Sequence, residues 1–300
     1  MKKILCCDGG GVKGLITLHF LKKFEEDLLA LTGKGIYETF DIFGGSSIGA
    51  LITSCIVYTE HKRIDQIINN IFTYENVCKL FTKNYNIFGI LDAYRPTYSG
   101  VPKTQLIAKY FNDLKTCDTS KDVYITVYSA GKARLISSDN DEILLREILD
   151  AASAAPTYFP SGKFVENGIV KYGIDGAVVQ NNPTDLVYVK SLDKYPGDKM
   201  SVLSISTGEK ALDSEDYFQD WGIMQWATKG DIFNVILELD QSIVDFKMKI
   251  VSDALKHDYI RVTDIVNISL DDISKFNEFK EIGEKWYSSK RNEILKVFLN

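Results

Sequence analysis

The chain has 300 residues, of which 45% are hydrophobic and 25% are charged. This balance is typical of a globular protein and excludes a disordered or collagen-like chain. Its 35 lysines and arginines stand against 41 aspartates and glutamates, a formal net charge of −6. An acidic chain is poorly suited to the phosphate backbone of nucleic acids, so we expect no nucleic-acid partner.

The predicted elements begin with a short buried strand at residues 3–7. An amphipathic helix follows over residues 12–31, because its leucines and Phe24 recur every three or four positions. The apolar run at residues 40–43 predicts a second strand, and residues 47–58 predict a helix that leaves this strand through glycines. A strand, a tight turn and a helix thus occur twice near the start of the chain.

Strands and helices continue to alternate further along the chain. Residues 123–129, 133–137 and 201–206 predict strands, and residues 142–152 predict a helix. Such alternation is typical of a layered α/β fold. There is no internal repeat and no long Pro/Gly/Ser linker, so we expect one domain over residues 1–300.

Two segments differ from this pattern. Residues 76–103 place aromatic residues, among them Phe81 and Phe88, between Asn, Gly and Pro without a regular period. This predicts a loop-rich cap or pocket rim, with packing in the core as the alternative. In residues 273–299, apolar side chains recur every three or four positions and lysines are balanced by glutamates. That balance favours a helix docked on the core over a helix on a membrane surface.

We expect a cytoplasmic protein, because no secretory signal is visible in the sequence. Only four apolar residues follow the two N-terminal lysines before Asp8, too few for a secretory signal. The longest uncharged run, residues 42–59, is interrupted by three glycines and two adjacent serines, which is unsuited to crossing a bilayer. The five cysteines are an odd number without a CxxC pair, which favours reduced thiols.

The first candidate site is a glycine-rich turn between the first strand and the first helix. It consists of Asp8, Gly9, Gly10, Gly11, Val12, Lys13 and Gly14. Glycines let the backbone turn sharply and aim several N–H groups at one point, where the helix N-terminus adds positive potential. An anion or a developing oxyanion could therefore bind there.

The same turn also matches the G-x-G-x-x-G fingerprint of dinucleotide-binding folds. Two features count against that interpretation. Asp8 would place a carboxylate near a pyrophosphate, and the second predicted strand is followed by glycines and serines instead of an acidic residue. A dinucleotide-dependent oxidoreductase remains a remote alternative.

The second candidate site is a G-x-S-x-G pentapeptide at the next strand-to-helix joint. It consists of Gly45, Ser46, Ser47, Ile48 and Gly49. A nucleophile elbow needs small residues two positions before and after the serine, because the chain turns too tightly for larger side chains. This predicts Ser47 as a nucleophile, whereas the alternative is that Ser46 or Ser47 only caps the helix.

A nucleophilic serine needs a base, and the three histidines, His19, His61 and His257, lie in no motif. A carboxylate is available at Asp175, which follows the apolar residues 169–174 and precedes Gly176. An Asp-Gly pair is in itself an ordinary turn. An aspartate with its usual pKa of about 3.9 is a poor base for an alcohol, so burial would have to raise that pKa.

These three motifs, in this order and spacing, resemble those of the patatin-like phospholipase family. Further matching segments lie at residues 95–100, 154–160, 181–183 and 203–208. The resemblance covers a motif-bearing core of about residues 1–210, and we expect residues 211–300 to form a C-terminal helical segment. The family implies a three-layer α/β/α sandwich with a mainly parallel central sheet.

The resemblance also implies a chemistry. Ser47 would be the nucleophile and Asp175 the base of a Ser–Asp dyad that cleaves carboxylic esters of glycerolipids through an acyl-enzyme, as a phospholipase A or lysophospholipase, without metal or cofactor. The oxyanion hole would be formed by the backbone amides of Gly9, Gly10 and Gly11. The supporting positions are Asp8, Lys13, Gly14, Gly45, Gly49 and Gly176.

Two positions depart from the family pattern without removing a reacting group. The family often has arginine in place of Lys13 and glycine in place of Ala177. The expected partners are a phospholipid or lysophospholipid and, transiently, the membrane surface. Some patatin-like proteins are effectors that wait for a partner protein or a cyclic nucleotide, so a phospholipase that is inactive without such an activator is the main alternative.

Overall fold

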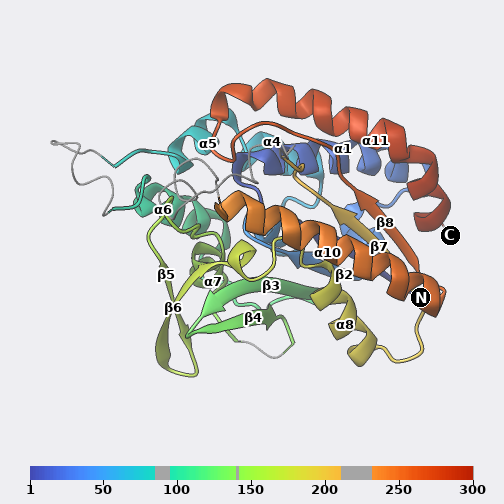
Figure 1. The fold of residues 1–300 in the computed structure, drawn as a ribbon, viewed down its shortest axis with the longest axis horizontal. Coiled ribbons are helices and arrows are strands. Elements are labelled where there is room, and N and C mark those ends of the chain that lie inside the picture. Colours follow the sequence, from blue (N-terminus) through green and yellow to red (C-terminus); the bar gives the residue numbers. More distant parts are fainter. Residues whose placement is uncertain (85–94, 140–141, 211–231, 300) are drawn as a thin grey trace, which may run out of the picture.

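The computed structural model describes residues 1–84, 95–139, 142–210 and 232–299 (Figure 1). Eight strands form one sheet in the order β5–β6–β3–β2–β1–β7–β8, and β4 pairs with β3. The strands are β1 (Lys2–Cys7), β2 (Ile42–Gly45), β3 (Asp122–Ser129), β4 (Lys132–Ser137), β5 (Gly162–Glu166), β6 (Ile169–Asp175), β7 (Met200–Ile205) and β8 (Asp258–Val262). The central run β3–β2–β1–β7–β8 is parallel, and the pairs that β4, β5 and β6 form are antiparallel.

Helices cover both faces of the sheet. Successive side chains of a strand point to opposite sides, so a buried strand contributes apolar side chains to both faces. In β1, Leu5 and Cys7 face one hydrophobic core and Ile4 and Cys6 face the other. The first core lies under α1 (Gly14–Thr32), α3 (Ile48–Tyr58) and α11 (Phe276–Phe298), and the second under α8 (Thr184–Lys194) and α10 (Ile232–Leu255). The fold is therefore the predicted three-layer α/β/α sandwich with a mainly parallel sheet.

Smaller helices complete the layer that holds α1. They are α2 (Ile36–Thr39), α4 (Ile64–Asn70), α5 (Tyr74–Leu80), α6 (Gly100–Phe111) and α7 (Leu145–Ala152). The predicted aromatic segment, residues 76–103, thus contains the end of α5 and the start of α6; its residues 85–94, including Phe88, lie outside the described residues. None of the described helices has a stretch long and apolar enough to span a bilayer.

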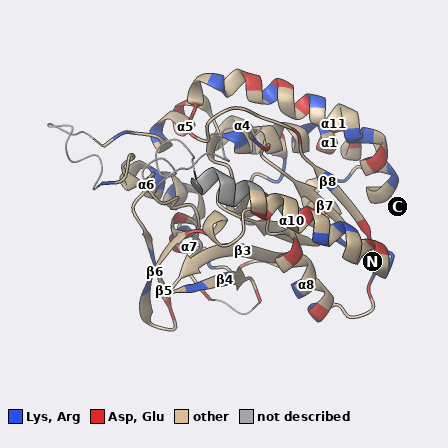
Figure 2. Cartoon of the chain, in the orientation of Figure 1, with Lys and Arg blue, Asp and Glu red and all other residues tan. Residues whose placement is uncertain are grey.

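The predicted C-terminal helical segment, residues 211–300, also contains a strand, β8. This strand pairs in parallel with β7 and extends the sheet. The predicted C-terminal helix is α11, which buries Phe279 and Trp286 and lies alongside α1 (Figure 1). Basic residues and glutamates alternate along this helix (Figure 2). The predicted docking of this helix on the core is confirmed.

The register of β3 brings the two predicted catalytic segments together. β2 pairs with the first half of β3, where Gly45 lies opposite Ile125. β6 pairs with the second half, where Asp175 lies opposite Val127. Because β4 pairs with β3 over residues 124–129, it fills the other edge, and β2 and β6 must meet end to end on the same edge. The residues that follow β2 therefore lie beside the last residue of β6.

Candidate active site

Ser47 occupies a tight turn between β2 and α3. Its backbone has φ of 52° and ψ of −122°, a conformation that is strained for a residue other than glycine and is typical of functional sites. Gly45 ends β2, and Gly49 packs against the end of β1: a Cβ at Gly49 would lie 2.1 Å from the carbonyl oxygen of Cys7. The small residues thus allow the turn that presents Ser47 at the N-terminus of α3.

The structure places Ser47 against Asp175, 128 positions later in the chain. Ser47 Oγ donates a hydrogen bond of 2.5 Å to Asp175 Oδ2. The other carboxylate oxygen accepts a hydrogen bond of 2.8 Å from the Ala177 N–H, and Gly176 begins the turn that carries this donor. Burial raises the pKa of Asp175 to about 6, although both hydrogen bonds and the nearby Lys103 oppose the shift. A carboxylate with a pKa near neutrality can accept a proton from an alcohol more readily than an ordinary one.

The histidines lie elsewhere. His257 Nδ1 is hydrogen-bonded to the hydroxyl of Tyr188 at 2.7 Å, and none of His19, His61 and His257 is among the described residues that line the pocket around Ser47. Of the polar groups that the sequence offered as a base, only Asp175 is brought to Ser47.

The glycine-rich turn lies beside Ser47, but its three amides differ. The Gly9 N–H donates a hydrogen bond of 3.1 Å to the carbonyl oxygen of Asn181, so the expectation that this amide faces an oxyanion is corrected. Gly10 and Gly11 have φ values of 152° and 59° and line the pocket with Ser47. Within the described part of the chain, neither of their N–H groups has a hydrogen-bond partner. These two amides are therefore the available donors.

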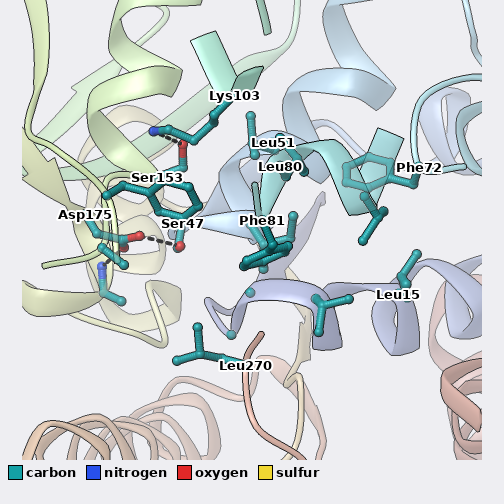
Figure 3. Close-up of a pocket in the computed structure, with 18 of the residues that line it drawn as sticks. Leu15, Ser47, Leu51, Phe72, Leu80, Phe81, Lys103, Ser153, Asp175 and Leu270 are labelled. Carbon is teal, nitrogen blue, oxygen red and sulfur yellow. Dashed lines mark hydrogen bonds between the residues drawn. The ribbon is translucent and has the colours of Figure 1, made fainter. Parts of the chain in front are cut away.

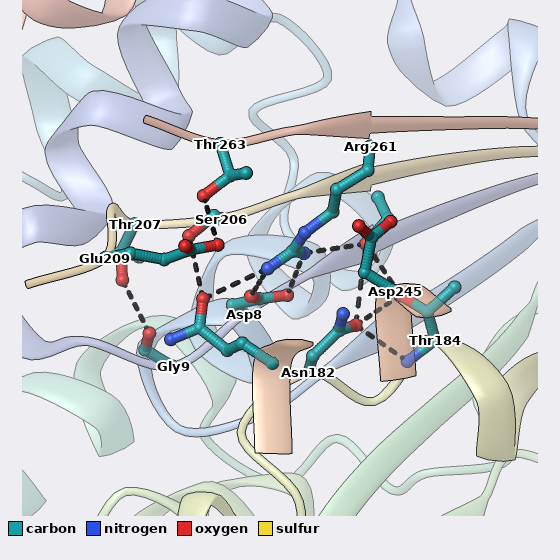
Figure 4. A network of polar contacts seen from close by, with 12 residues as sticks. Asp8, Gly9, Asn182, Thr184, Ser206, Thr207, Glu209, Asp245, Arg261 and Thr263 are labelled. Carbon is teal, nitrogen blue, oxygen red and sulfur yellow. Dashed lines mark hydrogen bonds and ion pairs between the residues drawn. The ribbon is translucent and has the colours of Figure 1, made fainter. Parts of the chain in front are cut away.

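Asp8 does not face the pocket, because it forms a buried ion pair with Arg261 of β8. The guanidinium binds both carboxylate oxygens of Asp8 at 2.9 and 2.6 Å (Figure 4). It also donates hydrogen bonds to Ser204 Oγ and Gln241 Oε1. Neither Asp8 nor Arg261 is exposed, and burial raises the pKa of Asp8 to about 6 against the effect of Arg261. Arg261 holds Asp8, the first residue of the glycine-rich turn, but no feature of the sequence pointed to Arg261.

Two other segments hold the turn from outside. Thr207 Oγ1 donates a hydrogen bond of 2.7 Å to the carbonyl oxygen of Gly9, and the Val12 N–H donates one of 2.8 Å to the carbonyl oxygen of Leu270. Lys13 Nζ contacts the carbonyl oxygen of Gly208 at 3.5 Å. Gly14 then begins α1. The turn is thus fixed by residues about 200 and more positions away in the sequence.

The pocket in front of Ser47 is mainly apolar. Its apolar lining consists of Val12, Leu15, Ile48, Leu51, Phe72, Val77, Leu80, Phe81, Ala155, Phe159, Ala177 and Leu270 (Figure 3). Phe81, from the predicted aromatic segment, is part of this lining. Such a pocket fits a hydrocarbon chain whose ester end reaches Ser47.

Lys103, from the first turns of α6, is a charged residue in this wall that the sequence did not reveal. Its Nζ lies 2.6 Å from the carbonyl oxygen and 3.1 Å from the carboxylate of Asp150, and 3.2 Å from Ser153 Oγ. The side chain is only 4% exposed. Its positive charge favours the ionised form of Asp175 and so lowers the pKa of that carboxyl.

Comparisons with known proteins give the family to which the chain belongs. A family model described as patatin-like phospholipase matches residues 5–188, which include all three motifs. Patatin-like protein 1 of Arabidopsis thaliana is 25% identical over 96% of this chain and 81% of that protein, and patatin-like protein 2 of the same plant is 28% identical over 87% and 75%. Among solved structures, VipD from Legionella pneumophila aligns over 96% of this chain and 67% of its own with a TM-score of 0.44 and 12% identity. Because the family model matches more than half of the chain, this protein belongs to the patatin-like phospholipase family.

Proposed function

We propose that this chain is a phospholipase A or lysophospholipase in which Ser47 is the nucleophile and Asp175 the base. Family membership supports lipid acyl hydrolysis in general and does not favour the dinucleotide alternative. The observation that carries the finer assignment is the 2.5 Å hydrogen bond from Ser47 Oγ to a buried carboxylate at the end of an apolar pocket.

The acylation step follows from this geometry. Asp175 takes the proton of Ser47 as Oγ attacks the ester carbonyl carbon, and the N–H groups of Gly10 and Gly11 stabilise the tetrahedral oxyanion. The intermediate collapses, the C–O bond to the alcohol breaks, and the alcohol takes the proton from Asp175. Deacylation follows the same steps with water. Asp175 accepts a proton from the water, and the hydroxide attacks the acyl carbon. The bond from that carbon to Ser47 Oγ then breaks, and Oγ takes the proton from Asp175.

The apolar wall favours a substrate with a hydrocarbon acyl chain. The acyl chain would lie against Leu15, Leu51 and Phe72, and the polar head group would remain towards water. Because such a substrate resides in a bilayer, the enzyme would act at a membrane surface as a peripheral cytoplasmic protein, with the whole chain as one domain.

Covalent labelling tests the nucleophile. A long-chain alkyl fluorophosphonate is expected to modify Ser47 of the wild type, and peptide mass spectrometry should locate the adduct there. Ser46→Ala is the matched control. Ser46 is buried in the same turn and should not react, so this variant should still be labelled on Ser47. An adduct on another residue, or an unlabelled folded wild type, would contradict the assignment. Turnover of phospholipid by the purified chain would further argue against an obligate activator.

The pH dependence tests the base. Only ionised Asp175 can take the proton of Ser47, and its pKa is raised to about 6. We therefore expect kcat/KM for a soluble short-chain ester to be level above about pH 7 and to fall about tenfold per pH unit well below pH 6. The profile should be measured from about pH 4 to about pH 8, with far-UV circular dichroism at each pH to show that the fold is retained.

A charge variant makes this test specific. Lys103→Met removes a positive charge that favours the Asp175 carboxylate, so the midpoint of the profile should move to higher pH, whereas Lys103→Arg should leave it nearly in place. A wild-type profile that stays flat through pH 6 would contradict the role of a raised carboxyl pKa.

A further inference from the structure

A second apolar cavity lies behind the wall of the active-site pocket. Leu51, Phe72 and Leu80 line both cavities, so these three side chains form a partition between them. Figure 3 shows the three residues on the side of the pocket away from Asp175. The remaining lining of the second cavity consists of Cys55, Ile71, Leu106, Ile107, Tyr110 and Phe111.

The second cavity has no charged residue in its described lining and is suited to hydrocarbon. Cys55 is buried, and burial raises the pKa of its thiol, so the sulfur stays neutral. The hydroxyl of Tyr110 is already used, since it donates a hydrogen bond of 2.5 Å to the carbonyl oxygen of Asn70. Ile107 and Phe111 are buried side chains of α6. A polar head group would therefore lose its hydrogen bonds to water there without replacement.

Helix α3 gives the position of this cavity relative to the nucleophile. Ser47 immediately precedes the helix, Leu51 lies four residues further and Cys55 eight residues further. At a rise of 1.5 Å per residue, the partition is about 6 Å and the second cavity about 12 Å along the helix axis from Ser47. The second cavity thus continues the first in the direction that leads away from the dyad.

The partition has one side in the middle of a helix and another side at the ends of helices. Leu51 belongs to the middle of α3, which packs on the sheet. Leu80 is the last residue of α5, and Phe72 lies in the connection between α4 and α5. Leu80 is also only partly buried, unlike Leu51. A rotation of the Leu80 side chain would therefore disturb less packing than a movement of α3.

We propose that the second cavity is the distal part of the acyl site and that the partition of Leu51, Phe72 and Leu80 sets the preference for acyl-chain length. Short acyl chains fill the first pocket, and long chains pass the partition and place their methyl end between α3 and α6. This inference rests on the proposed role of Ser47 as nucleophile. It assigns a long-chain lipid ester as the preferred substrate.

The test is a chain-length profile with nitrophenyl esters of butyrate, octanoate and palmitate, all presented in the same detergent micelles. Ile107→Phe fills the second cavity from α6 and should lower the palmitoyl-to-butyryl ratio of kcat/KM at least tenfold, since each methylene taken from water is worth about fourfold. Leu80→Ala opens the partition and should raise the same ratio. Val101→Phe is the control: Val101 lies on the same helix, is 62% exposed and lines neither cavity.

The outcomes separate this inference from the function on which it rests. An unchanged ratio in both variants, with butyryl hydrolysis abolished by Ser47→Ala, would overturn the acyl-chain inference alone. Butyryl hydrolysis that survives Ser47→Ala would overturn the proposed nucleophile. In that case calorimetric binding of palmitate and octanoate decides the inference, because Ile107→Phe should weaken palmitate selectively. If Ile107→Phe does not fold, Cys55→Met fills the cavity from α3 and should give the same loss.

Discussion

Replacing Asp175 with asparagine is expected to lower kcat for ester hydrolysis by about 10³–10⁴-fold. The asparagine oxygen can still accept the N–H of Ala177, so its NH₂ group turns to Ser47. The Ser47 hydroxyl then accepts a hydrogen bond where it previously donated one, and no group takes its proton. Steady-state hydrolysis of a short-chain ester measures the loss, and a variant that keeps more than a tenth of the wild-type kcat would show that another group acts as the base.

The same substitution is expected to stabilise the protein at alkaline pH. The folded protein holds the proton of Asp175 more tightly than the unfolded chain, because burial raises the pKa from 3.8 to about 6. The free energy of unfolding therefore falls as pH rises from about 4 to about 6, and the cost remains at higher pH. Asparagine cannot ionise, so Asp175→Asn should be more stable than the wild type by about 1–3 kcal/mol at about pH 8.

Urea unfolding at about pH 8 and about pH 4 measures this gain, which should disappear at the lower pH. Ser47→Ala is the matched inactive variant, because it removes the hydroxyl that donates to Asp175 while leaving the buried carboxylate in place. It should therefore lose activity without becoming more stable. An Asp175→Asn protein that is less stable than the wild type at pH 8 would contradict an energetic cost of the ionised base.

The dyad could be predicted from the sequence because each half is set by a local pattern. The small residues around Ser47 specify a strand-to-helix turn, and Asp175 ends a mostly apolar stretch before a glycine. That the two halves meet depends on the register of β3, which pairs with β2 over one part of its edge and with β6 over the next. No periodicity in the sequence gives this register, so only the three-motif resemblance could join the halves in advance.

Supporting contacts could not be predicted, because they join positions that lack a local pattern. Whether the Gly9 amide is free depends on the carbonyl oxygen of Asn181, and the partner of Asp8 is Arg261, 253 positions away. Arg261 itself lies in β8, a strand at the edge of the sheet within the predicted C-terminal helical segment. Lys103 gave no signal either, since a lysine in an amphipathic helix is ordinarily exposed.

The buried pair of Asp8 and Arg261 leads to the largest expected effect on stability. Arg261→Met should lower the free energy of unfolding by about 3–5 kcal/mol, because it leaves the Asp8 carboxylate buried without its counter-charge. The double variant Asp8→Asn with Arg261→Met removes both charges and should recover most of that loss. Urea unfolding of the wild type, both single variants and the double variant gives the coupling energy between the two side chains.

A surface pair in the same protein provides the comparison. Arg291 also binds both carboxylate oxygens of its partner Asp27, at 2.6 and 3.0 Å, but its side chain is 46% exposed. Water and salt screen this pair, so its coupling energy should be below about 1 kcal/mol. If Arg261→Met costs no more than Arg291→Met, the carboxylate of Asp8 is not held as a charge. In that case the start of the glycine-rich turn would be fixed by its other contacts, such as those with Thr207 and Leu270, and not by the buried guanidinium.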